Sequence, residues 1–434
     1  MQCSWKSVVV LALASVAVQY TAVRTVRTFS SSLLCSVGLA PTSCTTNWSL
    51  HPSNRAVRRT RQGSHPGCRH ASGHADSGTN ILILATTRSG SSFVGQLFNQ
   101  HPEVFYLFEP LYHVQMSLLP RPAQTGNVAE RRVMLRASRE LLRSLFRCGL
   151  HSLEGYIHPR PSGHLTEKLF RRGASRSLCS SPVCGAALDP KEQNLVLADE
   201  GECVRRCGPL NLTLAVDACR AKRHTAIKTV RIPQISDLRP LIEDPGLNLK
   251  VIQLVRDPRG ILASRIETFR DTYRLWRLWR ATGRRPPNLD LRQISTVCED
   301  FLRSVSTGLS RPAWLKGRYT LLRYEDLARS PLQKTRELFS FLGLALDRSV
   351  VDWILNNTRG GRDPSSRQKF TTARDSAANA ENWRLKLSLD MVLYTQTACQ
   401  PLLGLLGYKT VVHPRELRNL SRSLVENRTF LPFS

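Results

Sequence analysis

Five short apolar runs lie in the middle of the chain, and each predicts a buried β-strand. They cover residues 81–85, 104–108, 225–230, 249–255 and 319–322. Apolar positions at helical spacing follow the first run at 93–100 and the second run at 129–147. Strands that alternate with helices are typical of a parallel sheet covered by helices. The pattern therefore predicts an α/β fold with a central parallel sheet, in which the first two strands and the helix between them form a compact βαβ unit.

The N-terminal segment 7–23 is apolar and uncharged, and it lies between Lys6 and Arg24. It is slightly shorter than the roughly 20 residues that span a bilayer. Two interpretations stay open: a signal anchor retained as a single transmembrane helix, and a signal peptide cleaved near Ser15-Val16-Ala17. Both send the rest of the chain into the secretory pathway. We take the anchor as the prediction, with residues 1–6 as a cytoplasmic tail.

Composition divides the rest of the chain. Residues 24–79 are rich in Ser, Thr, Arg, His and Gly, show little apolar periodicity, and are expected to form a flexible lumenal stem. The strand and helix patterns predict a compact domain over 80–410, with a cysteine-rich insertion around 179–219. Residues 411–434 are treated as a C-terminal tail.

Cysteines and glycosylation motifs favour an oxidising compartment. Eleven of the twelve cysteines follow the apolar segment, and five cluster at Cys179, Cys184, Cys203, Cys207 and Cys219. We expect disulfides in this cluster, because a zinc site would favour C-x-x-C pairs, which the sequence lacks; no metal is predicted. The odd count leaves one thiol free or available for an interchain bridge, such as that of a homodimer. Five N-x-Ser/Thr motifs predict N-glycosylation and begin at Asn47, Asn211, Asn356, Asn419 and Asn427.

The chain is strongly basic. Lys and Arg total 62 against 33 Asp and Glu, which gives a net charge of +29. This excess favours polyanionic partners: nucleic acid, anionic membrane, sulfated glycan or phosphorylated nucleotide. The secretory features oppose a nucleic-acid-binding module, so no nucleic-acid partner is predicted. A nonenzymatic membrane protein that binds glycosaminoglycans fits both charge and topology, and it stays open as an alternative.

The residues Thr86 to Phe93 join the first strand to the helix after it. Helix N–H groups without intrahelical partners, the positive end of the helix dipole, small hydroxyl residues and Arg88 together favour a phosphate-like anion. A helix start capped in the ordinary way by Ser or Thr is the alternative. The loop lacks the first glycine of the Walker A motif, so an ATPase or GTPase is poorly supported.

A second basic loop follows the strand 249–255. It reads Arg256-Asp257-Pro258-Arg259-Gly260 and leads into a predicted helix that begins Ile261-Leu262-Ala263-Ser264. Ligands of open α/β sheets bind at the carboxyl ends of strands, so the two loops are expected to face one crevice. The simpler alternative is an ordinary ion pair between Arg256 and Asp257 at a turn.

Taken together, the two loops resemble a known family. The first, Thr87-Arg88-Ser89-Gly90-Ser91-Ser92-Phe93, is similar to the 5′-phosphosulfate site of Golgi carbohydrate sulfotransferases. The second, from Arg256 to Ser264, is similar to their 3′-phosphate site. Further resemblance lies in residues 96–100, 108–111, 323–327 and 432–434, so that it extends over nearly the whole chain.

The resemblance implies a P-loop-like sulfotransferase fold and the donor 3′-phosphoadenosine 5′-phosphosulfate. It also implies a single-pass type II protein of the Golgi membrane, whose catalytic domain, residues 80–410, is lumenal. The similarity is strongest to enzymes that sulfate the 6-hydroxyl of galactose in keratan sulfate and related glycans, and this acceptor is the prediction. GlcNAc and GalNAc also offer a primary 6-hydroxyl and stay open as acceptors.

The resemblance also implies roles for individual residues, according to their positions in the two motifs. Ser91 and Ser92, with neighbouring amides, would hold the 5′-phosphosulfate, while Arg256 and Ser264 would hold the 3′-phosphate. Sulfuryl transfer spreads negative charge over the equatorial oxygens and the leaving phosphate, so fixed positive charge lowers the barrier. Arg88 is predicted to supply this charge through hydrogen bonds and not as a proton donor, because arginine stays protonated near neutral pH. The predicted donor site comprises Thr87, Arg88, Ser89, Gly90, Ser91, Ser92, Phe93, Arg256, Asp257, Pro258, Arg259, Gly260, Ile261, Leu262, Ala263 and Ser264.

A sugar hydroxyl loses its proton during transfer, so a general base is expected. Glu109 is the prediction, because it ends the strand 104–108 and precedes Pro110, which disfavours helix at that point. His113 is the second choice. A salt bridge between Glu109 and a donor-site arginine is the structural alternative.

Two further segments flank these candidates. Trp276 and Trp279 stand three apart on a predicted helix and are expected to pack inward. The arginines between and after them, with Arg284 and Arg285 beyond, are expected to form a basic rim for the acceptor. In the segment 324–327, the acidic residues are expected to cap the helix that follows the last strand, which is a structural role.

Overall fold

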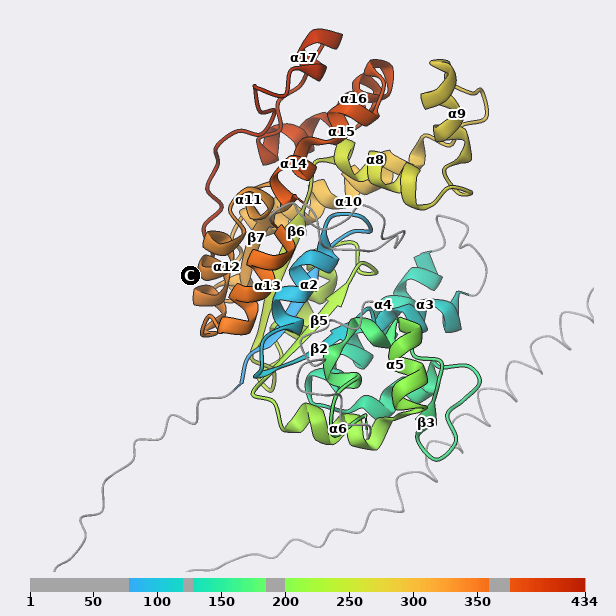
Figure 1. The fold of residues 1–434 in the computed structure, drawn as a ribbon, viewed down its shortest axis with the longest axis vertical. Helices are drawn as coiled ribbons and strands as arrows, with labels where there is room; N and C mark the ends of the chain where they lie inside the picture. The colour runs from blue at the N-terminus through green and yellow to red at the C-terminus, as the bar shows by residue number, and fades with distance from the viewer. Residues whose placement is uncertain (1–77, 120–127, 185–199, 359–374, 434) are drawn as a thin grey trace, which may run out of the picture. The chain divides into compact units, whose positions relative to one another are not determined.

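The computed structural model describes residues 78–119, 128–184, 200–358 and 375–433. Their centre is a five-stranded sheet in the order β2-β5-β1-β6-β7 (Figure 1). Every neighbouring pair in it is parallel. The strands are β1 (Asn80–Leu84), β2 (Val104–Phe108), β5 (His224–Thr229), β6 (Leu249–Val255) and β7 (Tyr319–Arg323). The predicted α/β fold with a central parallel sheet is confirmed, and each predicted strand is present within one or two residues of its expected bounds.

The expected compact βαβ unit is wrong in one respect, because β1 and β2 are not neighbours. Strand β5 lies between them and pairs with both, so that Leu82 faces Ile227 and Leu107 also faces Ile227. The chain therefore leaves β1 toward one edge of the sheet, whereas β6 and β7 extend the sheet toward the other edge. The boundary between β1 and β6 is a topological switch point, where open α/β sheets bind ligands.

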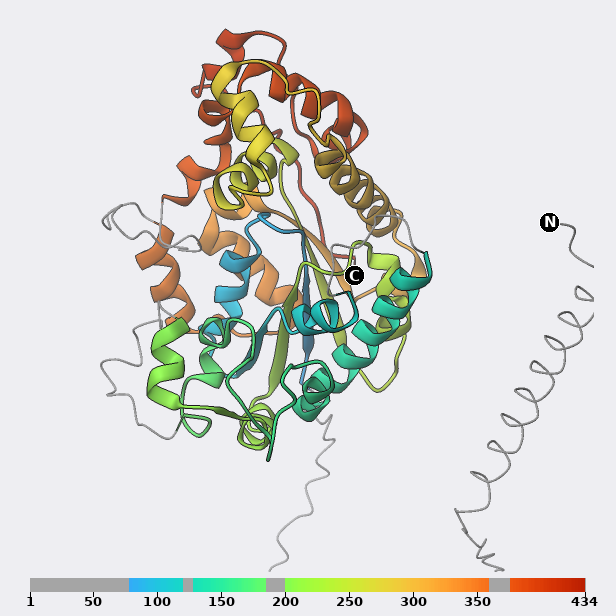
Figure 2. The same cartoon turned by 90° about the vertical axis from the view of Figure 1, so that its right-hand side faces the viewer.

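Helices cover both faces of the sheet because its strands are apolar on both sides (Figures 1 and 2). Ile81 and Ile83 point to one face, whereas Leu82 and Leu84 point to the other. The first face packs against α2 (Ser91–Asn99), α11 (Tyr324–Arg329), α12 (Pro331–Leu342), α13 (Arg348–Thr358) and α14 (Ser376–Glu381). The second face packs against α3 (Leu111–Leu118), α4 (Val128–Phe146), α8 (Pro258–Thr268), α10 (Arg292–Leu309) and α16 (Leu389–Leu406).

Shorter elements complete the described residues. They are η1 (Leu150–Gly155), β3 (Leu165–Thr166), η2 (Arg172–Ala174), η3 (Arg176–Leu178), α5 (Glu200–Cys207), β4 (Leu210–Asn211), α6 (Leu212–Arg220), η4 (Ile235–Leu238), α7 (Arg239–Ile242), α9 (Arg274–Thr282), η5 (Ala313–Leu315), α15 (Trp383–Lys386) and α17 (Pro414–Arg418). Strands β3 and β4 pair antiparallel as a separate two-stranded sheet.

Disulfides hold the insertion between α4 and β5. Cys179 pairs with Cys203 and Cys184 with Cys207, which confirms the expected staples. Cys219 pairs outside the cluster, with Cys148 just after α4. A fourth disulfide, Cys298–Cys399, joins α10 to α16. The eight cysteines of the described residues are therefore all oxidised.

The C-terminal residues up to 433 pack against the domain. Arg384 is fully buried and donates to the carbonyl oxygens of Glu416, Leu417, Asn419 and Arg422. The Phe433 N–H donates to the carbonyl oxygen of Tyr319, at the start of β7. The predicted tail 411–434 thus lies, over its described part, on the same structural unit as the sheet.

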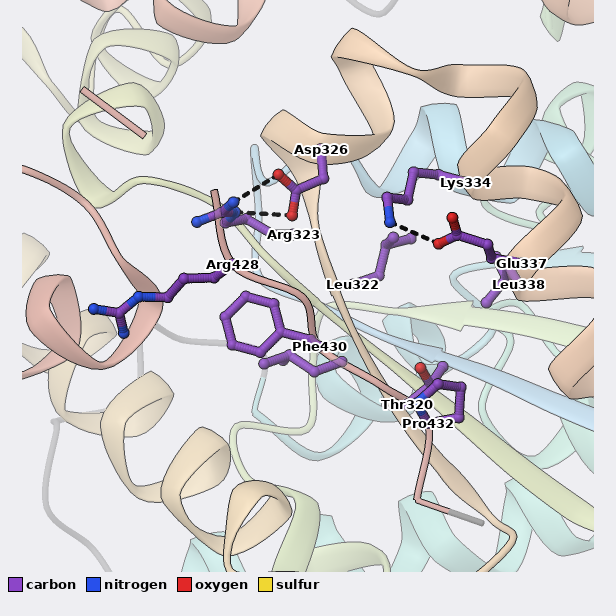
Figure 3. A pocket seen from close by; sticks show the side chains of 11 residues that line it. Thr320, Leu322, Arg323, Asp326, Lys334, Glu337, Leu338, Arg428, Phe430 and Pro432 are labelled. Atoms are coloured by element: carbon purple, nitrogen blue, oxygen red, sulfur yellow. Dashed lines mark hydrogen bonds and ion pairs between the residues drawn. The ribbon is translucent and has the colours of Figure 1, made fainter. Parts of the chain in front are cut away.

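Figure 3 shows a small pocket between β7, α12 and this C-terminal segment. Its lining includes Phe430 and two ion pairs, Arg323–Asp326 and Lys334–Glu337. The volume is about 50 Å³. Small-molecule pockets usually measure roughly 300 to 1,000 Å³, so this one does not suit a nucleotide.

The predicted tail 1–6, anchor 7–23 and nearly all of the stem 24–79 lie outside the described residues, as does Asn47. Among the helices that the structure describes, none has both the length and the apolar character of a membrane span.

Candidate functional site

The loop after β1, residues Thr86 to Gly90 (the first loop), delivers the chain to the start of α2. Gly90 is the N-cap residue with φ of +94°, and no side chain caps the helix. A Cβ on Gly90 would lie 2.3 Å from Cδ2 of Tyr324, so backbone conformation and space both require glycine there. The alternative of a helix start capped by a Ser or Thr side chain is therefore wrong. The helix dipole and the N-terminal amides of α2 favour an anion at this point.

The second loop, Arg256 and Asp257, follows β6 and is joined to the first. Arg256 Nη1 donates to the carbonyl oxygen of Arg88 over 3.0 Å. Arg88 Nε donates to Ser264 Oγ, on α8, over 2.9 Å. The structure thus brings together three of the predicted donor-site residues, and both loops leave the sheet at its switch point. The two loops therefore adjoin, as the expectation that they face one crevice requires, and the crevice itself stays a prediction.

The side chain of Arg256 has capacity for a further partner. It is 8% exposed, and its guanidinium lies 4.5 Å above the Tyr324 ring. Its Nε is buried without a hydrogen-bond partner among the residues that the structure describes. A Cβ on Gly260 would lie only 3.1 Å from this Nε, so glycine leaves the space that the guanidinium occupies. A charged donor held in this way suits a phosphate group. The alternative of an ordinary Arg256–Asp257 ion pair does not describe the site, because Asp257 pairs with Arg259.

Several of the predicted donor-site residues are buried and stabilise the conformation of the two loops. Arg259 is fully buried, and its Nη2 lies 2.7 Å from Oδ2 of Asp257, which also caps α8. Ser89 is also fully buried, and its Oγ donates to the Thr86 carbonyl oxygen. The remaining predicted residues that pack inward are Ser91, Phe93, Pro258, Gly260, Ile261, Leu262 and Ala263. Thr87 and Ser92 are partly exposed.

Arg265 holds the first loop against α8 through hydrogen bonds, a role that was not predicted from the sequence. Its Nε donates to the Thr87 carbonyl oxygen and its Nη2 to Thr86 Oγ1, each over 3.2 Å. The sequence feature that could have indicated this role was its position directly after Ser264 on the same predicted helix. Arg265 therefore ties α8 to the first loop a second time.

Glu325 holds the second loop through a hydrogen bond to Asp257, and its side chain makes no cap hydrogen bond with α11. It is fully buried, accepts the Asp257 N–H over 3.1 Å and accepts the Tyr408 hydroxyl over 2.7 Å. The N-cap of α11 is Arg323, and no side-chain hydrogen bond caps the helix. Glu325 and Asp326 lie in the first turn of α11, which agrees with the expected structural role of the 324–327 segment near the positive end of the helix dipole. Burial, followed by the neighbouring Asp257 carboxylate, raises the pKa of Glu325 to about 7.

Glu109 lies at the end of β2, at the same carboxyl edge of the sheet. Its side chain is 3% exposed, and its φ is +52°. Glu109 Oε1 lies 2.7 Å from Lys228 Nζ, and Oε2 lies 3.4 Å from Arg231 Nε. These three residues form the Glu109 cluster. The carboxylate is ion-paired, as the structural alternative expected, but with these two cations; its role as a base stays a prediction.

The cations of the Glu109 cluster were missed by sequence reasoning, although a lysine within the apolar strand β5 was a signal. Lys228 Nζ lies 4.3 Å from the centre of the Phe108 ring, and burial lowers its pKa. Arg231 lies 5.0 Å from the centre of the Tyr112 ring, which stacks on Phe170. Aromatic faces and cations therefore surround the carboxylate.

His113 is poorly placed to be a base. Its Nε2 accepts the Phe170 N–H over 2.9 Å. Burial, with a further contribution from Arg231, lowers its pKa to about 4. The ring is thus neutral over the physiological range, and one of its nitrogens is already occupied.

Helix α9 presents the expected two faces. Trp276 and Trp279 are 0% and 3% exposed, which confirms that they pack inward. Arg274 and Arg277 are exposed, as are Arg284 and Arg285 beyond the helix, whereas Arg280 is partly buried. These four exposed arginines, on α9 and just after it, are the basic surface of α9.

Comparison with known proteins adds the family. A model described as a sulfotransferase domain matches residues 78–407. The chain is 62% identical over 433 residues to carbohydrate sulfotransferase 1 of Danio rerio, with 100% of both chains covered. It is 44% identical over 375 residues to carbohydrate sulfotransferase 3 of Mus musculus, covering 86% of this chain and 77% of that one.

A solved structure was also found. The sulfotransferase domain from the curacin biosynthetic pathway is 15% identical, with a TM-score of 0.34, and the match covers 75% of this chain and 97% of that chain.

Proposed function

Because the chain belongs to the sulfotransferase family, we propose that it transfers a sulfuryl group from 3′-phosphoadenosine 5′-phosphosulfate to the 6-hydroxyl of galactose in keratan sulfate and related glycans. The observation that carries the proposal is the junction of the two loops, in which Arg256 binds the Arg88 carbonyl and Arg88 binds Ser264. One nucleotide can reach both loops only if they adjoin.

The residues present fit the donor. The uncapped start of α2 and the hydroxyl of Ser92 suit the 5′-phosphosulfate. Arg256, with its buried and unpartnered Nε, and Ser264 suit the 3′-phosphate. When bound, the donor supplies the sulfuryl group, with its 5′-phosphate as the leaving group.

The chain's own residues would act by position and charge. Arg88 stabilises the negative charge that develops on the transferring group, because its guanidinium is fixed by Ser264. Glu109 takes the proton of the sugar hydroxyl. Lys228 and Arg231 hold this carboxylate in place through their ion pairs with it.

The acceptor is the finer part of the proposal. Relatives whose names say carbohydrate sulfotransferase support a sugar acceptor. The exposed arginines of α9 and after it support an anionic glycan. Sulfate transfer from labelled donor to defined keratan, chondroitin and GlcNAc-terminated oligosaccharides, with mapping of the modified carbon, tests the choice. We expect galactose C6; labelling of chondroitin alone would overturn galactose in favour of GalNAc.

The alternative class is a nonenzymatic glycosaminoglycan-binding membrane protein. Saturable binding of 3′-phosphoadenosine 5′-phosphate favours the enzyme, whereas glycan binding without nucleotide binding favours this alternative. No observation on the described residues favours it over the enzyme.

The location is proposed to be the Golgi membrane, with a single-pass type II topology and a lumenal catalytic domain. Four disulfides support an oxidising lumen. The sequon residues Asn356, Asn419 and Asn427 are exposed, and Asn211 is partly exposed. Sensitivity of the cellular protein to N-glycosidase, and its protection from protease in sealed microsomes, test this topology. A homodimer is part of the same proposal and is tested by the mass of the purified protein in solution.

A further inference from the structure

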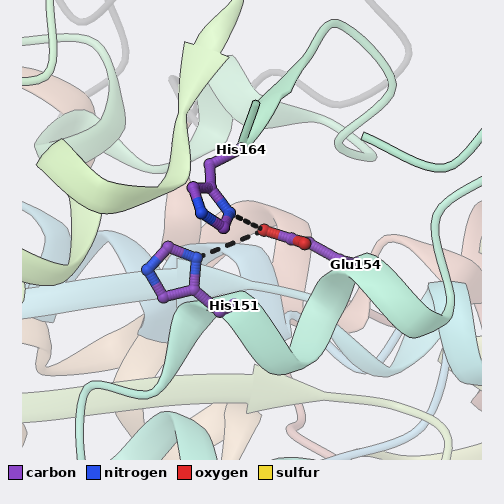
Figure 4. A group of neighbouring side chains, drawn as sticks. All are labelled: His151, Glu154 and His164. Carbon is purple, nitrogen blue, oxygen red and sulfur yellow. Dashed lines mark hydrogen bonds and ion pairs between the residues drawn. The ribbon is translucent and has the colours of Figure 1, made fainter. Parts of the chain in front are cut away.

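A second cluster of polar side chains lies in the insertion. His151 and Glu154 belong to η1, and His164 directly precedes β3 (Figure 4). Residues three apart eclipse one another on a 3₁₀-helix, so η1 presents His151 and Glu154 on one side. His164, from the segment just before β3, faces these two residues, and Figure 4 shows the three side chains converging.

The distances suit a metal ion. Glu154 Oε1 lies 3.2 Å from His151 Nδ1 and 2.7 Å from His164 Nδ1. The ligand atoms of all three residues lie within 4.8 Å of one another. Zinc binds His and carboxylate ligands at about 2.0 to 2.2 Å in tetrahedral geometry, which places neighbouring ligand atoms roughly 3.3 Å apart. Small side-chain rotations would therefore open this hydrogen-bonded group into a coordination shell.

The competing explanation is that these three side chains form only an ion-paired group. Their arrangement is more convergent than ion pairing alone requires. Both imidazole nitrogens point at the same carboxylate oxygen, although a carboxylate offers two. His164 also adopts a left-handed backbone conformation, with φ of +63°, which is uncommon outside glycine. Its carbonyl oxygen accepts the Leu212 N–H, which fixes the segment that carries the ring.

The surrounding framework holds the ligands in place before a metal binds. The disulfide Cys148–Cys219 anchors the chain just before η1. Pairing of β3 with β4 anchors the chain just after His164. The imidazole side chains are 41% and 53% exposed, so an ion can reach them and retain water ligands, whereas Glu154 is 13% exposed.

We propose that His151, Glu154 and His164 form a site for a divalent transition metal, with Zn²⁺ as the natural occupant. Two imidazoles and one carboxylate match the ligand preference of zinc, whereas Ca²⁺ and Mg²⁺ prefer sets made of oxygen. The ion joins η1 to the β3–β4 sheet and stabilises the insertion. The site is separate from the two loops and takes no part in sulfuryl transfer.

Calorimetric titration of the metal-free, full-length protein with ZnCl₂ tests the proposal. We expect the wild-type protein to bind one more Zn²⁺ than a variant that carries His151→Ala, Glu154→Gln and His164→Ala. The single substitution His164→Ala, at a largely exposed side chain, should weaken this site by at least the roughly tenfold to hundredfold that losing an outer-shell partner costs. His413→Ala removes an exposed histidine far along the chain and should change nothing.

Other histidines and four cysteines, Cys3, Cys35, Cys44 and Cys68, precede the described residues, so the signal must be assigned to this cluster. With Co²⁺ as the probe, the site should give d–d bands without thiolate charge transfer, and these bands should disappear in His164→Ala. Zn²⁺ should also raise the melting temperature of the wild type but not that of His164→Ala. Equal stoichiometry and affinity in the wild type and His164→Ala would overturn the proposal.

Discussion

Two regions at the carboxyl edge of one sheet handle charge in opposite ways. In the two loops, Arg256 leaves a buried Nε without a partner among the described residues, and no side chain caps α2. In the Glu109 cluster, the carboxylate is closed in by Lys228 and Arg231. The loops are thus organised to receive an anion from outside, whereas the carboxylate of the cluster is already paired with cations of the chain itself. Substitutions in the loops should therefore change ligand affinity, and substitutions in the cluster should change turnover and stability.

The largest effect is expected for Glu109→Gln. Loss of a general base lowers turnover by about 10² to 10⁴-fold. Because Gln leaves the buried Lys228 and the partly buried Arg231 without this counter-charge, the melting temperature should fall as well. Single-turnover sulfate transfer measures the first effect, and donor affinity should be preserved.

Glu103→Gln is the matched control, because Glu103 is exposed and lies just before the opposite end of β2. It should leave turnover unchanged. Near-normal turnover of Glu109→Gln with intact donor binding would reduce Glu109 to a structural residue and remove the proposed base.

A stability effect is expected from Glu325. Unfolded, this carboxyl ionises near its ordinary pKa of 4.5, whereas the folded protein holds its proton up to about pH 7. Between these values the folded state binds more protons, so the free energy of unfolding decreases as pH rises. Over this pH range, Glu325 lowers the free energy of unfolding by on the order of 3 kcal/mol. Glu325→Gln should flatten the stability profile between about pH 4.5 and 7, measured by denaturant unfolding. An identical slope in both proteins would contradict the assigned cause.

Arg256→Ala should weaken donor binding by about one to two orders of magnitude. A hydrogen bond to a charged group contributes roughly 1.5 to 3 kcal/mol. Titration with 3′-phosphoadenosine 5′-phosphate measures the change. Arg348→Ala, whose side chain is 93% exposed, is the control for general loss of positive charge. Unchanged affinity in Arg256→Ala would remove the second loop from the donor site.

The smallest effect is expected on the basic surface of α9. Arg277→Ala should raise the KM for a sulfated acceptor by roughly twofold to fivefold, since exposed ion pairs contribute only about 0.2 to 1 kcal/mol. The increase should shrink at high salt, and donor affinity should stay constant. An equal increase with a neutral acceptor would argue against an electrostatic contact.

The sequence predicted what depends on local patterns. Apolar runs located all the strands of the sheet, and the turn and helix chemistry of residues 86–93 and 256–264 located both loops. It did not predict that β5 lies between β1 and β2, because strand order depends on long-range packing. For the same reason, Lys228 could not be assigned to Glu109: the two residues are distant in sequence and meet only because β2 pairs with β5. The contacts of Glu325 with Asp257 and Tyr408 could not be predicted either, because they join segments that are distant in sequence.

The central claim is that the two loops, with the helix starts that follow them, form one donor site. Nucleotide binding by variants of α2 and α8 tests it most directly. Calorimetry with 3′-phosphoadenosine 5′-phosphate should show saturable binding to one site in the wild-type protein. Ser92→Ala at the start of α2 and Ser264→Ala on α8 should each weaken it. Absence of saturable binding, or sensitivity to only one of the two substitutions, would contradict the account.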